Sequence, residues 1–155
     1  MIQRDYILRL IDQLGALLRA LLSSEAHVKR PQQPISDAAQ LDVALEKSCQ
    51  EAMGLSLRTI NELPPDELME VLRSGRATWI SRCFFVGRLF EFDAEVARHI
   101  KKHERAKQSI QRALYFYTFL CSNPEVPDEY RVEERFKQAA KLLAACDPRS
   151  LRDTL

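Results

Sequence analysis

The sequence has few of the residues that interrupt helices and few of those that build strands. It contains four glycines and seven prolines among 155 residues, and β-branched residues are sparse. Alanine, leucine, arginine, glutamate and glutamine dominate instead, and all of these favour helices. No alternating apolar and polar segment lies between turn residues, so we find no candidate strand. The composition therefore predicts an all-α fold, a helical bundle or hairpin array.

The charge balance lacks a dominant sign. Lys+Arg number 23 and Asp+Glu 22, which leaves a formal net charge of +1. No global field would attract nucleic acid or an anionic membrane to such a chain. A hydrophobic content of 46% with 29% charged residues is typical of globular proteins rather than of disordered ones.

Paired cysteines are also missing. Cys49, Cys83, Cys121 and Cys146 lie far apart, and no C-x-x-C pair occurs. Each falls on or beside the apolar stripe of an expected helix, where a free cysteine behaves as a small apolar residue. We expect four reduced core thiols and a cytoplasmic protein.

No apolar run has the length of a membrane span. Met1–Tyr6 does not have the pattern of a signal peptide, and the run from Leu14 to Leu22 is short and interrupted by Arg19. We therefore expect no transmembrane segment.

Periodicity divides the chain into four parts. We expect an N-terminal amphipathic helical arm over residues 1–22, a linker over 23–34, a helical domain over 35–147 and a tail over 148–155. The linker has two prolines and no periodicity, which indicates a mobile connector.

The arm, helical from about Gln3 to Leu22, carries an apolar stripe with the i, i+3, i+4, i+7 spacing of a helix. The candidate interaction residues on this stripe are Ile7, Leu10, Leu14, Leu17, Leu18 and Leu21, and Ile11 lies among them. One hypothesis is that the stripe packs against a partner helix or a second copy. The other is that it folds back into the protein's own core.

Six further helical segments are expected in the domain. They span about 35–53 with Ser36 or Asp37 as the cap, 55–63, 65–73, 76–100, 104–122 and 128–146, and a loop covers 124–127. The segment from Arg76 is apolar around much of its first half, so we expect it to be the most buried element. Predicted inward residues include Val71, Ile100, Val132, Phe136, Ala139 and Ala140.

The opening of the chain resembles a family of small, uncharacterised bacterial proteins. The residues that carry the resemblance are Met1, Ile2, Arg4, Asp5, Tyr6, Ile7, Arg9, Ile11 and Gln13, together with the Leu55-Ser-Leu and Leu63-Pro-Pro-Asp-Glu-Leu segments and the later hairpin. The resemblance implies a bacterial origin and a helical fold, and no activity.

The hairpin over 76–122 is similar to one tetratricopeptide repeat. Ala106, Ile110 and Ala113 match the small, large, small spacing of the second helix of that repeat, and Phe90, Ala94 and Ala97 fall at packing positions of its first helix. Asp93 falls where a leucine is usual. The similarity covers about one unit, whereas a stable array has about three. It implies a helix–turn–helix scaffold that holds a peptide or another helix.

No motif predicts catalysis, a metal or a cofactor. His99 and His103 have the i, i+4 spacing of zinc ligands, but no glutamate lies between them and Lys101 and Lys102 disfavour a dication. No nucleophile elbow and no glycine-rich phosphate loop occurs. We therefore expect no catalytic, cofactor-binding or metal residues and no enzyme.

One basic cluster and one acidic set remain. The cluster comprises Arg98, Lys101, Lys102, Arg105, Lys107 and Arg112, and the acidic set comprises Glu125, Asp128, Glu129, Glu133 and Glu134. The acidic set is a simple partner for the cluster, within the chain or between subunits. An RNA-binding role for the cluster is the alternative, although the nearby aromatic residues lie at the far end of their helix.

These observations predict a protein-interaction or assembly module without catalytic activity. Its expected partner is a second copy or a partner helix or peptide. The alternatives are a protein that binds RNA through its basic patch and a helical protein that binds a small molecule.

Overall fold

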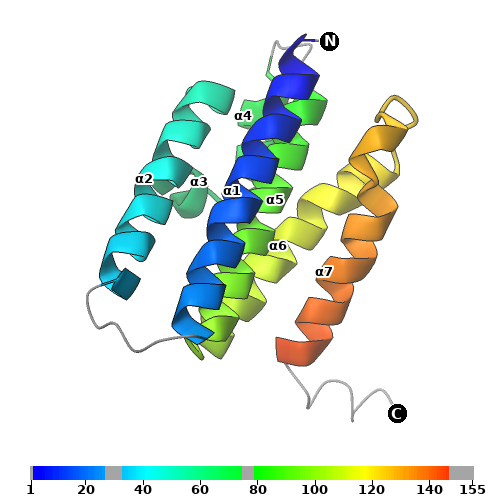
Figure 1. Ribbon diagram of the computed structural model, residues 1–155. Helices are drawn as coiled ribbons and strands as arrows, with labels where there is room; N and C mark the ends of the chain where they lie inside the picture. The colour runs from blue at the N-terminus through cyan, green and yellow to red at the C-terminus, as the bar shows by residue number, and fades with distance from the viewer. Residues whose placement is uncertain (1, 27–32, 75–78, 147–155) are drawn as a thin grey trace, which may run out of the picture. The chain divides into compact units, whose positions relative to one another are not determined.

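The structure, a computed structural model, describes residues 2–26, 33–74 and 79–146, and in 2–5, 21–26 and 33–42 it describes the backbone alone. In these residues every regular element is a helix (Figure 1). The elements are α1 (Ile2–Ala26), α2 (Gln33–Met53), α3 (Leu57–Glu62), α4 (Pro65–Arg73), α5 (Trp79–His99), α6 (His103–Cys121), the 3-10 turn η1 (Asp128–Tyr130) and α7 (Val132–Cys146). The predicted all-α class is confirmed.

Contacts divide the chain into two compact units, 1–64 and 65–155. In the first unit α1 and α2 run antiparallel and α3 packs against α2 (Figure 1). In the second, α5, α6 and α7 run in alternating directions, and α4 packs on α5 and α6. The boundary falls between α3 and α4.

The predicted linker is partly helical. Helix α1 continues to Ala26 and α2 already begins at Gln33, while 27–32 lie outside the described residues, as does the predicted tail. Pro34 is accommodated because the first turn of a helix makes no use of its N–H groups. Ser36 and Asp37 therefore lie within the helix, and their prediction as its cap was wrong.

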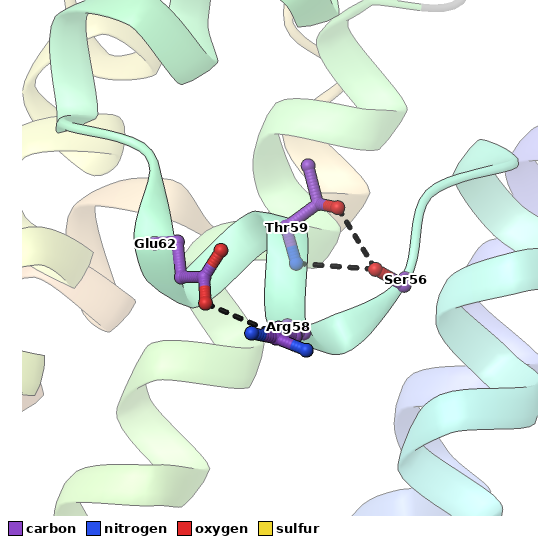
Figure 2. Close-up of polar contacts among 4 residues, drawn as sticks. All are labelled: Ser56, Arg58, Thr59 and Glu62. Carbon is purple, nitrogen blue, oxygen red and sulfur yellow. Dashed lines mark hydrogen bonds and ion pairs between the residues drawn. The ribbon is translucent and has the colours of Figure 1, made fainter.

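Helix α3 begins at a serine cap. The Ser56 hydroxyl accepts a hydrogen bond from the Thr59 N–H at 3.1 Å and also contacts the Thr59 hydroxyl at 2.8 Å. Arg58 and Glu62, one turn apart, form an exposed ion pair at 2.8 Å (Figure 2). The cap satisfies an N–H that the first turn leaves open, which allows so short a helix to form here.

A second interaction ties α3 to α2. Gly54 ends α2 with a φ of +67°, a backbone conformation that glycine adopts without steric cost. The chain then folds back, and the Leu57 N–H donates to Glu46 of α2 at 2.9 Å. The predicted helix end at Gly54 is confirmed.

Helix α5 is the most buried element of the second unit, as predicted. Aromatic side chains fill the space beside it. Phe90 stacks on Phe116 of α6 with ring centroids 6.0 Å apart, and Phe84 stacks on Tyr130 at 4.7 Å. The Tyr130 hydroxyl also shares a hydrogen bond with Ser81 at 2.6 Å. Tyr130 thus joins the turn before α7 to α5.

Several residues predicted to face inward are exposed. Val71 is exposed while Met69 is buried, because α4 turns the face of Leu68, Met69 and Leu72 inward. Ile100 is 43% exposed because α5 ends at His99 and leaves it in the turn.

Phe136 and Ala140 of α7 are also exposed. Helix α7 packs mainly against α6, so its buried stripe is narrow. Val132, Ala139 and Cys146, spaced by seven residues, form that stripe. Seven residues are close to two helical turns, which leaves Phe136 beside the contact rather than in it.

Gly87 sets the distance between α5 and α6. A Cβ built on Gly87 would lie 2.5 Å from Cε1 of Tyr117, well inside van der Waals contact. The two helices therefore approach closely only because this position has no side chain, and the tyrosine ring fills the space. Ala97 of α5, Ala106 of α6 and Cys146 of α7 form a small buried cluster.

We predict that Gly87→Ala destabilises the protein. Alanine is ordinarily better than glycine inside a helix by about 1 kcal/mol, but overpacking against the Tyr117 ring should cost about 1–3 kcal/mol. Urea unfolding followed by circular dichroism measures the difference, and Ala140→Gly on an exposed face calibrates the intrinsic helix effect. A more stable Gly87→Ala protein would show that the tyrosine ring is not held at this position.

Candidate functional site

The predicted interaction stripe on α1 is mostly enclosed by the chain itself. Ile7, Leu10, Leu14 and Leu18 are buried, whereas Leu17 is 37% exposed. The side chain of Leu21 lies outside the described residues. The burial of this stripe favours the second sequence-based hypothesis, in which it belongs to the protein's own core.

The contrast between two adjacent leucines tests this interpretation. Leu18→Ala should lower the free energy of unfolding by about 2–5 kcal/mol, since it empties a buried site. Leu17→Ala, the matched control, should cost at most about 1 kcal/mol because its side chain remains partly in water. Urea unfolding and light scattering on the same samples measure stability and mass. A smaller mass with unchanged stability for Leu18→Ala would instead place the stripe in an interface.

A buried carboxylate joins the helices of the second unit. Glu91 of α5 is 3% exposed. The Tyr117 hydroxyl of α6 donates to its Oε1 at 2.5 Å, and Nη1 of Arg88 donates to its Oε2 at 2.8 Å. Arg135 of α7 places Nη1 3.7 Å from the same Oε2. One carboxylate is thus shared by three helices.

Burial and charge shift the ionisation of this cluster. Burial raises the pKa of Tyr117 well above its usual value, and the Glu91 carboxylate adds to this shift. Burial alone would lower the pKa of Arg88, but Glu91 and Tyr117 raise it by more. At neutral pH Tyr117 is therefore a neutral phenol and Arg88 a charged guanidinium, and both contact Glu91. Enclosed in this way, the cluster acts as a tie between helices rather than as a site open to substrate.

We predict that Tyr117→Phe destabilises the protein and weakens its response to alkali. The lost hydrogen bond to a buried carboxylate is worth about 1.5–3 kcal/mol. Because the folded pKa of Tyr117 is raised, its contribution to stability is full below the unfolded value of 10.0 and is lost as pH rises above it. The variant should therefore lose stability less steeply above that pH, by up to about 1.4 kcal/mol per pH unit.

Unfolding in urea across the alkaline range measures this difference. Tyr115→Phe on the same helix is the control. Burial also raises the pKa values of the Cys49 and Cys83 thiols to about 12, but these act equally in both proteins. Parallel pH curves for the wild type and Tyr117→Phe would contradict the prediction.

The predicted basic cluster is divided by the fold. Nη2 of Arg105 lies 2.5 Å from Oδ1 of Asp93, and the Ser109 hydroxyl donates to the same carboxylate. The guanidinium of Arg112 lies over the Phe90 ring, 5.6 Å from its centroid. These interactions explain why an aspartate is accommodated at position 93, where the tetratricopeptide pattern has leucine. Both arginines therefore serve the α5–α6 contact.

Three of the four remaining cations lie at the turn between α5 and α6, residues 98–103, which we call the basic turn, whereas Lys107 lies in α6 and is half-buried. Arg98, Lys101 and Lys102 are exposed in the turn, beside Ile100. The Lys102 N–H donates to the Ala97 carbonyl at 2.8 Å, and Lys101 has a φ of +62°. A lysine in this left-handed conformation costs about 1 kcal/mol relative to the glycine usual at such a helix end.

The turn also separates the two histidines. His99 is the last residue of α5 and His103 the first of α6, so they do not share a helix face. Among the described residues, no group of three or more His, Cys, Asp or Glu side chains is arranged to hold a metal ion.

A groove of about 330 Å³ lies at the other end of α6, where the chain turns into α7. We call it the acidic groove. Leu120, Val126 and Val132 supply apolar lining, and Asp128, Arg131 and Glu133 supply charged lining. Arg131 has a φ of +51° and lies 3.8 Å from Glu134, so its charge is partly offset. Glu125 and Glu129 lie in the same stretch of sequence and are exposed. Residues 125–134 therefore carry five carboxylates and one arginine.

Cys121 lines the same groove and is exposed, contrary to its predicted place in the core. It is the last residue of α6, beyond the stripe that faces α5. Partial burial and the nearby Glu133 raise the pKa of its thiol. The protonated form therefore dominates at neutral pH, which makes a nucleophilic role a poor fit.

The basic turn and the acidic groove lie at opposite ends of α6 (Figure 1). A helix of 19 residues is about 28 Å long. This separation is too large for ion pairing within the unit. Of the two pairings that the sequence left open, only the one between molecules therefore fits this geometry.

Comparison with protein-family models, with curated proteins and with solved structures finds no match to this chain. The resemblances to a bacterial family and to a tetratricopeptide repeat therefore stay predictions. In the part of the chain that the structure describes, no helix combines the length and apolarity that a bilayer crossing needs.

Proposed function

We propose that this chain is a cytoplasmic protein-interaction module that docks a segment of a partner molecule, a second copy or a different protein, in the acidic groove. The observation that carries the proposal is a groove with apolar lining and a carboxylate rim at the end of a rigid helical unit. Such a surface suits association because it combines a seat for one apolar side chain with a charge preference. The four free cysteines fit a reducing compartment.

The chemistry of the groove defines its partner. Pro124 is exposed, and Val126 and Pro127 are half-buried, so an apolar side chain that enters here contacts hydrocarbon at these three residues. Asp128 and Glu133 are exposed at the rim, where they attract a cation and repel an anion. The preferred segment therefore carries an isoleucine or leucine flanked by lysine or arginine.

This proposal moves the docking surface away from α1. The stripe of α1 remains a candidate only through Leu17, since the neighbouring described leucines of the stripe are buried. Nucleic-acid binding is also less well supported than the sequence alone allowed. Arg105 and Arg112 are engaged with Asp93 and Phe90, which removes two cations from the patch that would track a phosphate backbone.

We predict that a blocked Lys-Ile-Lys-Lys peptide binds the groove and that a Glu-Ile-Glu-Glu peptide does not. Amide resonances of residues 120–133 should shift on titration. Asp128→Lys with Glu133→Lys should weaken binding about tenfold, the effect of losing two rim ion pairs of up to 1 kcal/mol each. NMR titration of labelled protein measures both effects.

Asp66→Lys with Glu67→Lys is the matched control. These two carboxylates lie in the first turn of α4 and are exposed, so the charge change is the same and Glu67, like Glu133, lies near the start of a helix. Binding should be unaffected in this variant. Equal affinity for the two peptides, or equal weakening in the two variants, would leave the groove without the proposed role.

A further inference from the structure

We infer that the segment docked in the acidic groove is the basic turn of a second copy, so that the protein associates through its two unlike ends. This inference rests on the proposed function and names the partner of the same groove. Three observations carry it: the shape of the basic turn, the opposite charges of the two ends, and the distance that keeps them apart within one unit.

The basic turn has the shape of the preferred segment. Ile100 is 43% exposed, a large fraction for a branched apolar side chain, and Lys101 and Lys102 follow it directly. The hydrogen bond from the Lys102 N–H to the Ala97 carbonyl fixes the backbone of the turn. The apolar residue and its flanking cations are therefore presented on a fixed backbone, which reduces the backbone entropy lost on binding.

The left-handed conformation of Lys101 is an independent sign that this turn is used. Glycine would occupy the position without strain, but the chain has a lysine there. Strained backbone positions tend to occur where a side chain is needed for function. The ammonium group of Lys101 is then the first contact that we assign to the carboxylate rim of the groove.

Charge selects this pairing over the alternatives. The segment 125–134 carries five carboxylates against one arginine, while the turn presents Arg98, Lys101 and Lys102 as exposed cations. Two basic turns repel each other, as do two acidic grooves. Only contact of unlike ends is attractive, either as a two-fold pair in which each turn enters the groove of the other copy or as a head-to-tail series.

The volumes are compatible with one turn in one groove. About 330 Å³ is close to the space of eleven water molecules, which accommodates an isoleucine side chain and part of a lysine stem. The buried contact area is small, so the complex is weak and forms only at high protein concentration. A two-fold pair fills both turns and both grooves, whereas a head-to-tail series leaves one turn and one groove open and continues into a ring or an open chain.

Complementary charge reversals test the inference. Variant A carries Lys101→Glu and Lys102→Glu, and variant B carries Asp128→Lys and Glu133→Lys. The wild type should show a weight-average mass that rises with concentration up to about 0.5 mM and falls when salt is raised from about 0.05 to 0.5 M. Each variant alone should remain monomeric, with self-affinity reduced at least about tenfold. Sedimentation and light scattering measure the masses.

Mixing the two variants is the decisive experiment. Variant A retains a native groove and variant B a native turn, so an equimolar mixture should recover the salt-sensitive association that neither shows alone. Lys137→Glu with Lys141→Glu on the exposed face of α7 controls for the change in charge and should associate as the wild type does. Circular dichroism of every variant verifies that the helices remain folded.

Three results would overturn the inference. They are a monomeric wild type at the highest concentration, a mixture that stays monomeric, or an association that disappears with nuclease, which would indicate a nucleic-acid bridge. If the Lys-Ile-Lys-Lys peptide still binds the groove in those cases, the proposed function stands and only the identity of the partner is wrong. Without peptide binding, both fail.

Lys101→Gly separates a structural role from a binding role. Removal of the left-handed strain should raise the thermal midpoint, while loss of the ammonium group should weaken association. Weaker association in a more stable protein cannot result from a damaged fold. Unchanged association in Lys101→Gly would remove Lys101 from the interface and count against the inference.

Discussion

The second unit depends on one buried carboxylate. Glu91 accepts hydrogen bonds from Tyr117 and Arg88 and attracts Arg135, so a single charge fixes the register of α5, α6 and α7. A buried carboxylate without these partners would cost several kcal/mol, which disfavours any sliding of the helices. This arrangement requires glycine at position 87, because only a position without a side chain allows the Tyr117 ring to lie against α5. The positions of the basic turn and the acidic groove follow from this register.

Much of the fold could be predicted because it is local. Helix propensity and apolar periodicity identified the helical segments, and Gly54 marked the end of α2. The errors have a common cause. Val71 and Phe136 are apolar residues at the edge of a helical stripe, and the sequence does not tell how wide a contact the neighbouring helix makes. For α1, an apolar stripe has the same pattern whether it faces a partner or the protein's own core.

The candidate site could be predicted only as two charged sets. The sequence displayed the cations near Lys101 and the carboxylates near Asp128 on either side of the predicted helix 104–122, but not that Arg105 and Arg112 are engaged within the fold. The groove depends on the backbone of the turn after α6, where Arg131 adopts a left-handed conformation. No residue pattern in the sequence predicts this conformation. Glu91 and Tyr117 are 26 residues apart, and neither spacing nor composition indicates that they meet. Tertiary geometry therefore decided which charges remain available at the surface.

The uneven burial of the cysteines has a practical consequence. Cys49 and Cys83 are enclosed and have thiol pKa values raised to about 12, and Cys146 is buried as well. Cys121 is the one exposed thiol among the four, and it lines the acidic groove. A thiol-directed fluorophore applied at mildly alkaline pH, where more of the thiol ionises, would therefore attach at this position without any engineered cysteine. The native chain thus supplies an attachment point for a spectroscopic probe in the acidic groove, where binding of a partner would change the environment of the probe.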